Sequence, residues 1–300
     1  MKPIILIAMN DPELVEHFLN CAPQVAPEVE WVLPTNPLAN KAKVAACWYP
    51  EASLLSDFPQ LECLHSVGAG EDNLGDLLSS GLKVERIIDE DQKVGMFEYV
   101  LWGVLYYQRD MDRYNQADKT KVWQPLPQRN TKNIKVGVLG LGEIGSFVAT
   151  KLASMGYQVS GWSRSPKHIE GVYSVHGNDA LPDMLGELDI LVNLLPLNTA
   201  TVGILNQSFL SMLPMTASLI NCGRGDHVIE EDLVELLSKN LLRGAILDVF
   251  KTEPLSSQSK LRNLDNVFIT PHIASSATPE VIVKQISTAA LGYQGQFVNA

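Results

Sequence analysis

The sequence predicts an α/β protein with two domains, each built around a parallel β-sheet. Short apolar runs bounded by turn residues alternate with helical patterns along the chain, as expected for strands joined by crossover helices. A glycine-rich turn stands between one of these runs and the helical pattern that follows it. The chain has 300 residues, of which 46% are hydrophobic, and this is enough for two cores.

The first half of the chain predicts a small flavodoxin-like domain. Its strands are expected at four short apolar runs: Ile4–Ala8, Val44–Trp48, Cys63–Val67 and Arg86–Ile88. A helix-like segment, Pro12–Cys21, follows the first run, and a longer apolar helix is expected at about Val94–Tyr107. This alternation favours a parallel sheet.

The second half predicts a doubly wound, Rossmann-like sheet. A loop is expected over Lys119–Lys132, which contains two prolines and shows no periodicity. Six strands are then expected: Lys135–Leu139, Gln158–Trp162, Ile190–Leu194, Ser218–Asn221, Ala245–Asp248 and Val267–Thr270. Helical patterns separate most of them, as in a doubly wound sheet. A last helix, Pro279–Gln294, is expected to return to the first domain. The expected domains are residues 1–97 plus 274–300, and residues 98–273.

The glycine-rich turn follows the first strand of the second domain. Residues 136–145 read Val-Gly-Val-Leu-Gly-Leu-Gly-Glu-Ile-Gly, and a helix is expected over Ile144–Met155. In this pattern Gly140 permits a tight turn, Gly142 lets the backbone approach a pyrophosphate, and Gly145 allows close helix–strand packing. Free N–H groups and the helix dipole favour the anion. A glycine-rich turn can be no more than a turn, but the flanking strand and helix favour a dinucleotide site.

The residues after the next strand indicate which dinucleotide is bound. NAD-binding proteins usually place Asp or Glu about 20 residues after the glycines, where it holds the ribose 2′-hydroxyl. Here Gln158–Trp162 is followed by Ser163-Arg164-Ser165-Pro166-Lys167, without a carboxylate. Arg164 can bind a 2′-phosphate bidentately, and a carboxylate would repel one. The alternative is a solvated basic loop. The position of the loop favours NADP(H), with NADPH preferred over NADH.

Charge and cysteine usage limit the function classes. The net charge is −11 and the isoelectric point is near 5.0, which argues against nucleic acid or an anionic membrane as partner. The cysteines show no Cys-x-x-Cys pair and no zinc-ligand spacing, so we expect reduced thiols, no metal and a cytoplasmic location. These cysteines are Cys21, Cys47, Cys63 and Cys222.

Three polar residues follow the last three strands of the second domain. Arg224, Glu253 and His272 each lie just after one of these strands, and parallel strands present such loops at one edge of the sheet. His titrates near neutral pH and can donate a proton to a developing alkoxide. Glu253 would favour the imidazolium form, and Arg224 would hold a substrate carboxylate bidentately. Each residue alone is more often solvated or structural, but the three together favour hydride transfer to a carbonyl.

A second glycine-rich turn lies in the first domain. Ser66-Val67-Gly68-Ala69-Gly70 follows a strand, and its N–H groups can form a small anion nest. A plain turn is an equal alternative. Trp48 follows another strand and is expected to border the same site, unless it is a core tryptophan.

Taken in order, these motifs resemble the D-isomer-specific 2-hydroxyacid dehydrogenases. The resemblance covers most of the chain and rests on these segments: Ser66–Gly70, Gly140–Gly145, Leu194–Pro196, Asn221–Gly225, Asp248–Pro254 and Pro271–His272. Other segments resemble the bacterial glyoxylate/hydroxypyruvate reductases of this family: Cys47–Pro50, Trp123–Pro127, Trp162–Arg164, Asn193–Pro196 and Thr201–Ile204.

The resemblance implies two Rossmann-like domains and a role for each site residue. Arg224 would bind the substrate carboxylate and carbonyl, His272 would be the general acid, and Glu253 would hydrogen-bond to His272. Val67, Gly68 and Ala69 would offer backbone N–H groups to the carboxylate, and Gly70 and Trp48 would complete the substrate site. The implied cofactor contacts are Gly140, Leu141, Gly142, Glu143, Ile144, Gly145, Trp162, Ser163, Arg164, Ser165, Lys167, Leu195, Pro196, Cys222 and Asp248. The resemblance also implies a homodimer.

The implied reaction is the NADPH-dependent reduction of small 2-oxoacids, namely glyoxylate to glycolate and hydroxypyruvate to D-glycerate. Two alternatives remain open. One is a dehydrogenase for larger 2-oxoacids or a phosphorylated hydroxyacid, although residues 45–75 contain no Arg or Lys to bind a phosphate. The other is a dinucleotide-sensing, corepressor-like binding protein, in which dimerisation matters more than turnover.

Overall fold

A computed structural model describes residues 2–177 and 179–295, and the chain forms two compact units. Unit 1 comprises Met1–Asp91 and Ser276–Ala300, and unit 2 comprises Gln92–Ser275. The first boundary between the units, after Asp91, falls within the helix α3 (Glu90–Gln108). The boundary expected after residue 97 falls within the same helix. Residues 296–300, at the end of the expected first domain, lie outside the described part.

Unit 1 is built on a parallel five-stranded sheet with the order β2-β1-β3-β4-β5. This strand order is that of flavodoxin-like proteins. The strands are β1 (Ile4–Met9), β2 (Glu30–Val32), β3 (Val44–Trp48), β4 (Cys63–Ser66) and β5 (Lys83–Glu85). The helical elements are α1 (Pro12–Val25), α2 (Leu54–Asp57), α9 (Pro279–Gly295) and the 3-10 helices η1 (Ala39–Lys41) and η2 (Asp72–Ser79).

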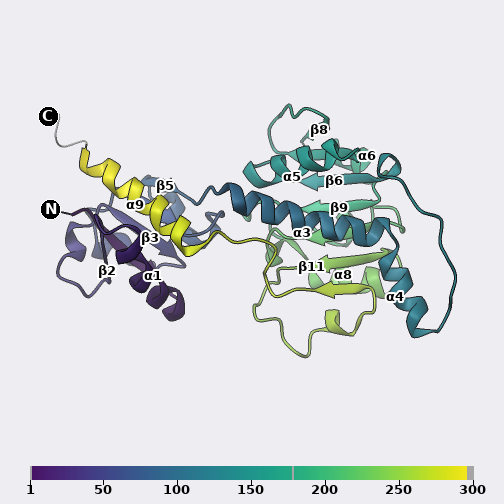
Figure 1. The fold of residues 1–300 in the computed structure, drawn as a ribbon, viewed down its shortest axis with the longest axis horizontal. Helices are drawn as coiled ribbons and strands as arrows, with labels where there is room; N and C mark the ends of the chain where they lie inside the picture. Colours follow the sequence, from purple (N-terminus) through teal and green to yellow (C-terminus); the bar gives the residue numbers. More distant parts are fainter. Residues whose placement is uncertain (1, 178, 296–300) are drawn as a thin grey trace. The chain divides into compact units, whose positions relative to one another are not determined.

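Alternating side chains of the unit 1 strands form a core on each face of the sheet. Ile5 and Ile7 pack with α1 and α9, whereas Ile4 and Leu6 pack with α2 and η2. The side chain of Asp11 accepts the N–H groups of residues 13 and 14 and so begins α1. The C-terminal helix α9 belongs to the same unit as the N-terminal strands (Figure 1).

Unit 2 is built on a parallel seven-stranded sheet with the order β12-β11-β10-β9-β6-β7-β8. The strands are β6 (Lys135–Leu139), β7 (Gln158–Ser163), β8 (Val172–His176), β9 (Ile190–Asn193), β10 (Ser218–Asn221), β11 (Gly244–Leu247) and β12 (Val267–Ile269). The order reverses between β6 and β9, which confirms the doubly wound prediction. Ligands bind at such a reversal, beyond the carboxyl ends of the strands.

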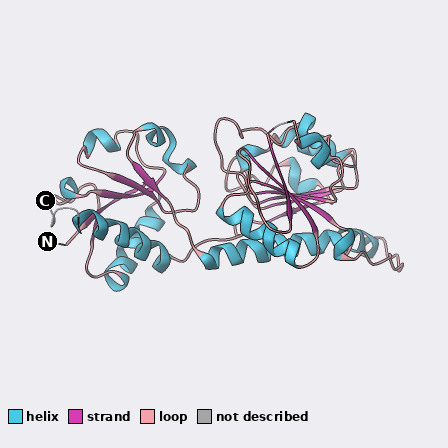
Figure 2. Ribbon diagram, turned by 90° about the horizontal axis from the view of Figure 1, so that it is seen from above, coloured by secondary structure: helices cyan, strands magenta, loops and turns pink. Residues whose placement is uncertain are grey.

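Helices cover both faces of the unit 2 sheet (Figure 2). The helices α3 and α5 (Glu143–Ser154) pack on one face. The other face carries α6 (Leu181–Leu185), α7 (Gln207–Leu210) and α8 (Glu230–Ser238). The remaining helices are α4 (Met111–Lys119), η3 (Thr131–Asn133), η4 (Gly225–His227) and η5 (Lys260–Asn263). Gly103 lets α3 approach the sheet, because a Cβ there would lie 2.8 Å from Cδ1 of Ile220.

The strand expected at Arg86–Ile88 is wrong, because the fifth strand of unit 1 lies at Lys83–Glu85. The N–H of Ile87 donates to Gly68 O, and Arg86 Nη1 donates to Ala69 O. Residues 86 and 87 therefore support the glycine turn after β4 and do not extend the sheet.

Candidate active site

The glycine-rich turn between β6 and α5 has the geometry that its sequence predicts. Gly140 has a φ of +93°, and a Cβ there would lie 2.6 Å from Leu194 O. A Cβ on Gly145 would lie 1.8 Å from Gly140 O, whereas a Cβ on Gly142 would meet no atom within 4 Å. Packing therefore requires Gly140 and Gly145, and Gly142 borders open space from which a ligand can approach the backbone. A pyrophosphate fits this open side of the turn.

The side chains around this turn connect it to neighbouring elements. Leu141 is buried against Gly161 of β7. Lys167 Nζ donates to Leu141 O at 2.5 Å, and Glu143 Oε2 lies 3.0 Å from Lys93 Nζ. Ile144 is half-buried and packs against the core beneath α3 and α5. Lys167 therefore places a positive charge beside the glycine turn and links it to the loop after β7.

Arg164 is exposed at the end of β7, and among the described residues it has no hydrogen-bond or ion-pair partner. Its neighbours are held by local contacts: Ser163 Oγ donates to Ser165 O at 2.8 Å, and the buried Trp162 donates from Nε1 to Gly177 O at 2.8 Å. The loop is thus shaped by its own hydrogen bonds, and the guanidinium is available to an anion.

The loops after β9 and β10 contain three further residues with an expected cofactor contact. Leu195 is buried, and its N–H donates to the side chain of Asn193. Pro196 is exposed, and its carbonyl accepts a hydrogen bond from Thr201. Cys222 is buried, and burial, with a smaller contribution from the charge of Asp248, raises the pKa of its thiol well above the usual value. Cys222 is therefore a protonated, unreactive thiol.

Arg224 follows β10 in a loop that packs on the loop after β11. Its side chain is half-buried, and Nη1 donates to Gly223 O at 2.9 Å. A Cβ on Gly225 would lie 1.8 Å from the carbonyl carbon of Phe250. Only glycine permits this approach, which brings the loop of Arg224 against the loop of Glu253.

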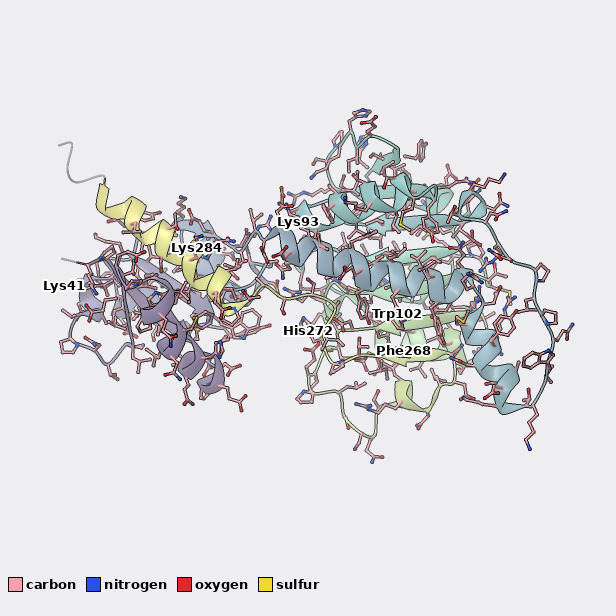
Figure 3. The ribbon with its side chains drawn as sticks, in the orientation of Figure 1. Lys41, Lys93, Trp102, Phe268, His272 and Lys284 are labelled. Carbon is pink, nitrogen blue, oxygen red and sulfur yellow. The ribbon has the colours of Figure 1, made fainter. Side chains whose placement is uncertain are left out.

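The side chains of Glu253 and His272 are in hydrogen-bond contact, and they lie on the loops that follow β11 and β12. His272 Nδ1 lies 2.8 Å from Glu253 Oε2, while Glu253 Oε1 accepts the N–H of Phe250 at 2.8 Å. The ionised carboxylate can only accept, so Nδ1 carries a hydrogen and Nε2 is left for proton transfer. His272 lies on the loop beyond β12 (Figure 3). The pair has the arrangement of a general acid held by a carboxylate.

Asp248 fixes the backbone around His272. His272 has a φ of +55°, which is uncommon for a residue other than glycine. Its N–H donates to Asp248 O at 2.8 Å, and the Asp248 carboxylate accepts the N–H groups of Ile273 and Ala274. Thr270 Oγ1 also donates to this carboxylate, at 2.6 Å. Asp248 is 1% exposed, and these four contacts hold the loop that presents His272.

In unit 1 the turn after β4 is held by its own hydrogen bonds. The N–H of Val67 donates to Cys47 O, and that of Gly68 donates to Ser66 Oγ. Within the described part of the chain, the N–H groups of Ala69 and Gly70 have no hydrogen-bond partner. The free donors of the turn are therefore these last two.

Trp48 lies against this turn. Its Cζ3 atom would be 3.2 Å from a Cβ on Gly68, and Trp48 is half-buried. Asn73, which is buried, donates from Nδ2 to Ser66 Oγ and to Gly70 O. Unit 1 therefore presents a rigid turn with an aromatic ring beside it.

Some residues that support the site were not foreseen from the sequence. They are Asn73 beside the turn of unit 1, Tyr99 and Thr270 behind Asp248, and Asn193, Asn221 and His227 beneath the loops of unit 2. A sequence signal exists for Asn193 and Asn221, which end the otherwise apolar strands β9 and β10. In the described residues, no group of His, Cys, Asp or Glu side chains is arranged to hold a metal ion. In the same residues, no helix combines the length and hydropathy needed to cross a membrane.

Comparison with known proteins identifies the family. Residues 101–274 match the family "D-isomer specific 2-hydroxyacid dehydrogenase, NAD binding domain". The chain belongs to the D-isomer-specific 2-hydroxyacid dehydrogenases. This confirms the family resemblance and makes the chain a member of an oxidoreductase family.

Individual members of the family are similar over most of the chain. Glyoxylate/hydroxypyruvate reductase A of Yersinia enterocolitica is 39% identical over 252 residues, which cover 82% of this chain and 80% of that protein. A family member from Klebsiella pneumoniae has a TM-score of 0.90 at 42% identity, with 98% of this chain and 94% of that one covered. The NADPH-dependent glyoxylate/hydroxypyruvate reductase of Sinorhizobium meliloti, in complex with NADP and sulfate, has a TM-score of 0.82 at 32% identity, with coverage of 99% and 94%.

Proposed function

We propose that this protein is an NADPH-dependent reductase of small 2-oxoacids, which converts glyoxylate to glycolate and hydroxypyruvate to D-glycerate. The observation that carries the proposal is the hydrogen-bonded pair of Glu253 and His272, with Arg224 on the adjoining loop of the same sheet edge. The relatives from Yersinia enterocolitica and Sinorhizobium meliloti are named for these two substrates, which supports the same substrate class here.

The proposed roles follow from the chemistry of each side chain. Arg224 binds the substrate carboxylate through paired hydrogen bonds and orients the adjacent carbonyl. His272 donates the proton from Nε2 to the carbonyl oxygen as charge develops there, and Glu253 stabilises the imidazolium through Nδ1. NADPH, when bound, supplies the hydride.

The proposed preference for NADPH rests on the loop after β7. Arg164 is exposed and unpaired among the described residues, and Lys167 lies against the glycine turn. Together they favour a ligand with an additional phosphate. The structure of the Sinorhizobium meliloti relative contains NADP. We expect Arg164→Ala to weaken NADPH binding far more than NADH binding. An equal loss of affinity for both dinucleotides would contradict the proposed role of Arg164.

The proposed preference for small substrates is supported by the relatives from Yersinia enterocolitica and Sinorhizobium meliloti, which are named for glyoxylate and hydroxypyruvate. Within unit 1, Trp48 packs on the turn after β4. We therefore expect kcat/KM to fall as the side chain of the 2-oxoacid becomes larger. Faster turnover of a larger 2-oxoacid than of glyoxylate would support the alternative function, a dehydrogenase for larger 2-oxoacids.

We also propose that the protein is a cytoplasmic homodimer. Trp123 is 99% exposed, and the partly exposed Trp102 of α3 makes an edge contact with Phe268 of β12 (Figure 3). Such apolar surface suits contact with a second copy of the chain. The proposed location follows from cysteines that are all free, without disulfides. Light scattering of the purified protein tests the dimer.

Substitution of Arg224 tests the proposed reaction. Arg224→Ala should lower kcat/KM for glyoxylate by about 100-fold or more, because a charged contact to the reacting group is lost, while binding of NADPH is kept. Arg224→Lys is the matched variant, since it keeps the charge but not the bidentate geometry. Turnover near that of the unchanged protein in Arg224→Ala would refute the proposal.

A further inference from the structure

Three buried polar side chains lie beneath the loops of the candidate active site and have no role in the reaction as proposed. Asn193 and Asn221 are the last residues of β9 and β10, and they are partners in the parallel register. His227 is the last residue of η4, three positions after Arg224. All three are 0% exposed. Polar groups so deeply buried are kept where their hydrogen bonds fix a structure.

The hydrogen bonds of His227 define its protonation state. Its Nδ1 lies 3.1 Å from the backbone N of Arg224 and 2.9 Å from Asn193 Nδ2. A backbone N–H can only donate, so Nδ1 is the acceptor and the hydrogen of the neutral ring is on Nε2. The Nε2 atom lies 3.4 Å from Pro196 O. One neutral imidazole therefore joins the loop of Arg224 to the loop after β9.

The two asparagines also help to fix the backbone of Arg224. Asn221 Nδ2 donates to the carbonyl of Arg224 at 3.3 Å, and Asn193 Nδ2 donates to Asn221 Oδ1 at 2.8 Å. The N–H of Arg224 is thus held by His227 and its carbonyl by Asn221. Gly223 fits closely over this network, since a Cβ there would lie 2.8 Å from Asn193 Nδ2 and 3.0 Å from His227 Nδ1.

We propose that His227 is a positioning residue, which sets the backbone of Arg224 so that its guanidinium meets the substrate carboxylate. This proposal rests on the role proposed above for Arg224. His227 is buried and acts through the peptide of Arg224, not by contact with substrate. A carboxylate held by two parallel hydrogen bonds tolerates little displacement of the guanidinium. Loss of the Nδ1 acceptor should therefore weaken the binding of the oxoacid and leave the binding of NADPH unchanged.

Two substitutions of His227 separate positioning from folding. His227→Leu removes the acceptor, whereas His227→Asn can offer Oδ1 close to the place of Nδ1. We expect His227→Leu to lower kcat/KM for glyoxylate by about 100-fold, mainly through KM, as for a group misplaced by about 1 Å. His227→Asn should restore part of this loss. The dissociation constant of NADPH, measured by fluorescence titration, should be the same in all three proteins.

A control for general destabilisation is available in the same unit. Gln108 is a buried polar residue that donates to Arg129 O and accepts from Tyr157, which precedes β7. Gln108→Leu should lower the melting temperature without a change in KM for glyoxylate. If His227→Leu does not fold, Gly223→Ala takes its place, because the added Cβ would push on the same network.

The outcomes distinguish this proposal from the proposed function. A normal KM and kcat in His227→Leu, or a loss no larger than that in Gln108→Leu at equal melting temperature, would overturn the positioning role alone. If Arg224→Ala also keeps its activity, the proposed function fails together with it. A raised KM in His227→Leu, with partial recovery in His227→Asn and unchanged NADPH binding, is the result we expect.

Discussion

Glu253 holds the imidazole of His272 by a 2.8 Å contact between Oε2 and Nδ1, and its second oxygen is held by the N–H of Phe250. The carboxylate therefore cannot rotate freely, and the imidazole ring is oriented by a fixed acceptor. This arrangement leaves Nε2 of His272 to act as the proton donor. It depends on two loops that follow neighbouring parallel strands, β11 and β12.

Glu253→Gln should lower kcat by about 100-fold, which is the scale of general acid catalysis. The amide keeps the size of the side chain but no longer stabilises a positive imidazolium. Because the Phe250 contact can survive through the amide oxygen, the melting temperature should change little. Steady-state kinetics with glyoxylate and a thermal melt measure both effects. An unchanged kcat would show that Glu253 does not act through His272.

Asp248→Asn should both destabilise the protein and lower kcat. The carboxylate accepts from Thr270 and from the N–H groups of Ile273 and Ala274, and an amide group would turn its own donors toward some of these. A buried donor left unsatisfied costs about 1–3 kcal/mol. Urea unfolding measures this loss. Unfolding and turnover that both match those of the unchanged protein would mean that Asp248 is not needed to hold His272.

The two glycines of the nucleotide turn should respond differently to alanine. Gly142→Ala adds a methyl group where no atom lies within 4 Å, whereas Gly145→Ala places one 1.8 Å from Gly140 O. We expect Gly142→Ala to fold normally and to lose affinity for NADPH, and Gly145→Ala to lose stability as well. Melting temperatures and NADPH titrations distinguish them. Normal NADPH affinity in Gly142→Ala would place the pyrophosphate elsewhere.

The buried cysteines should react slowly with iodoacetamide in mildly alkaline buffer. Burial raises the pKa of Cys222 well above its usual value and that of Cys63 to about 11, so little thiolate is present. The reactivity of Cys63 should increase as the pH rises toward about 11. Cys21, which is partly exposed, should be labelled first. Peptide mapping after labelling, with a urea-unfolded sample as control, tests this order. Rapid labelling of Cys222 in the folded protein would contradict it.

Most of the fold could be predicted because its central strands are continuous apolar runs. The strands β6, β9, β10 and β11 are buried almost throughout, so hydropathy locates them to within a residue. The edge strand β12 was also predicted, at Val267–Thr270. The other edge strands, β2, β5 and β8, were not located. β8 has no buried residue, and β5 reads Lys-Val-Glu. The helix α4 has no buried residue and a strongly polar composition, so it contains no apolar run that would locate it.

The positions of Arg224, Glu253 and His272 after neighbouring strands could be predicted, but the contacts that support these residues could not. Arg224, Glu253 and His272 follow strands, so topology alone brings their loops to one edge. The contact of Asn193 with His227 depends on the register of β9 and β10 and on the loop after β10, which leads to η4 and His227. The link from Tyr99 through Thr270 to Asp248 joins residues 171 and 22 positions apart. Such contacts arise from tertiary packing, which one sequence does not reveal.

The most direct test of the central claim is steady-state oxidation of NADPH and of NADH by the purified protein with glyoxylate, beside Arg224→Ala. We expect rapid turnover with NADPH, a clearly lower kcat/KM with NADH, and almost no turnover in the variant. Tight binding of NADPH without reduction of glyoxylate or hydroxypyruvate by the unchanged protein would contradict it.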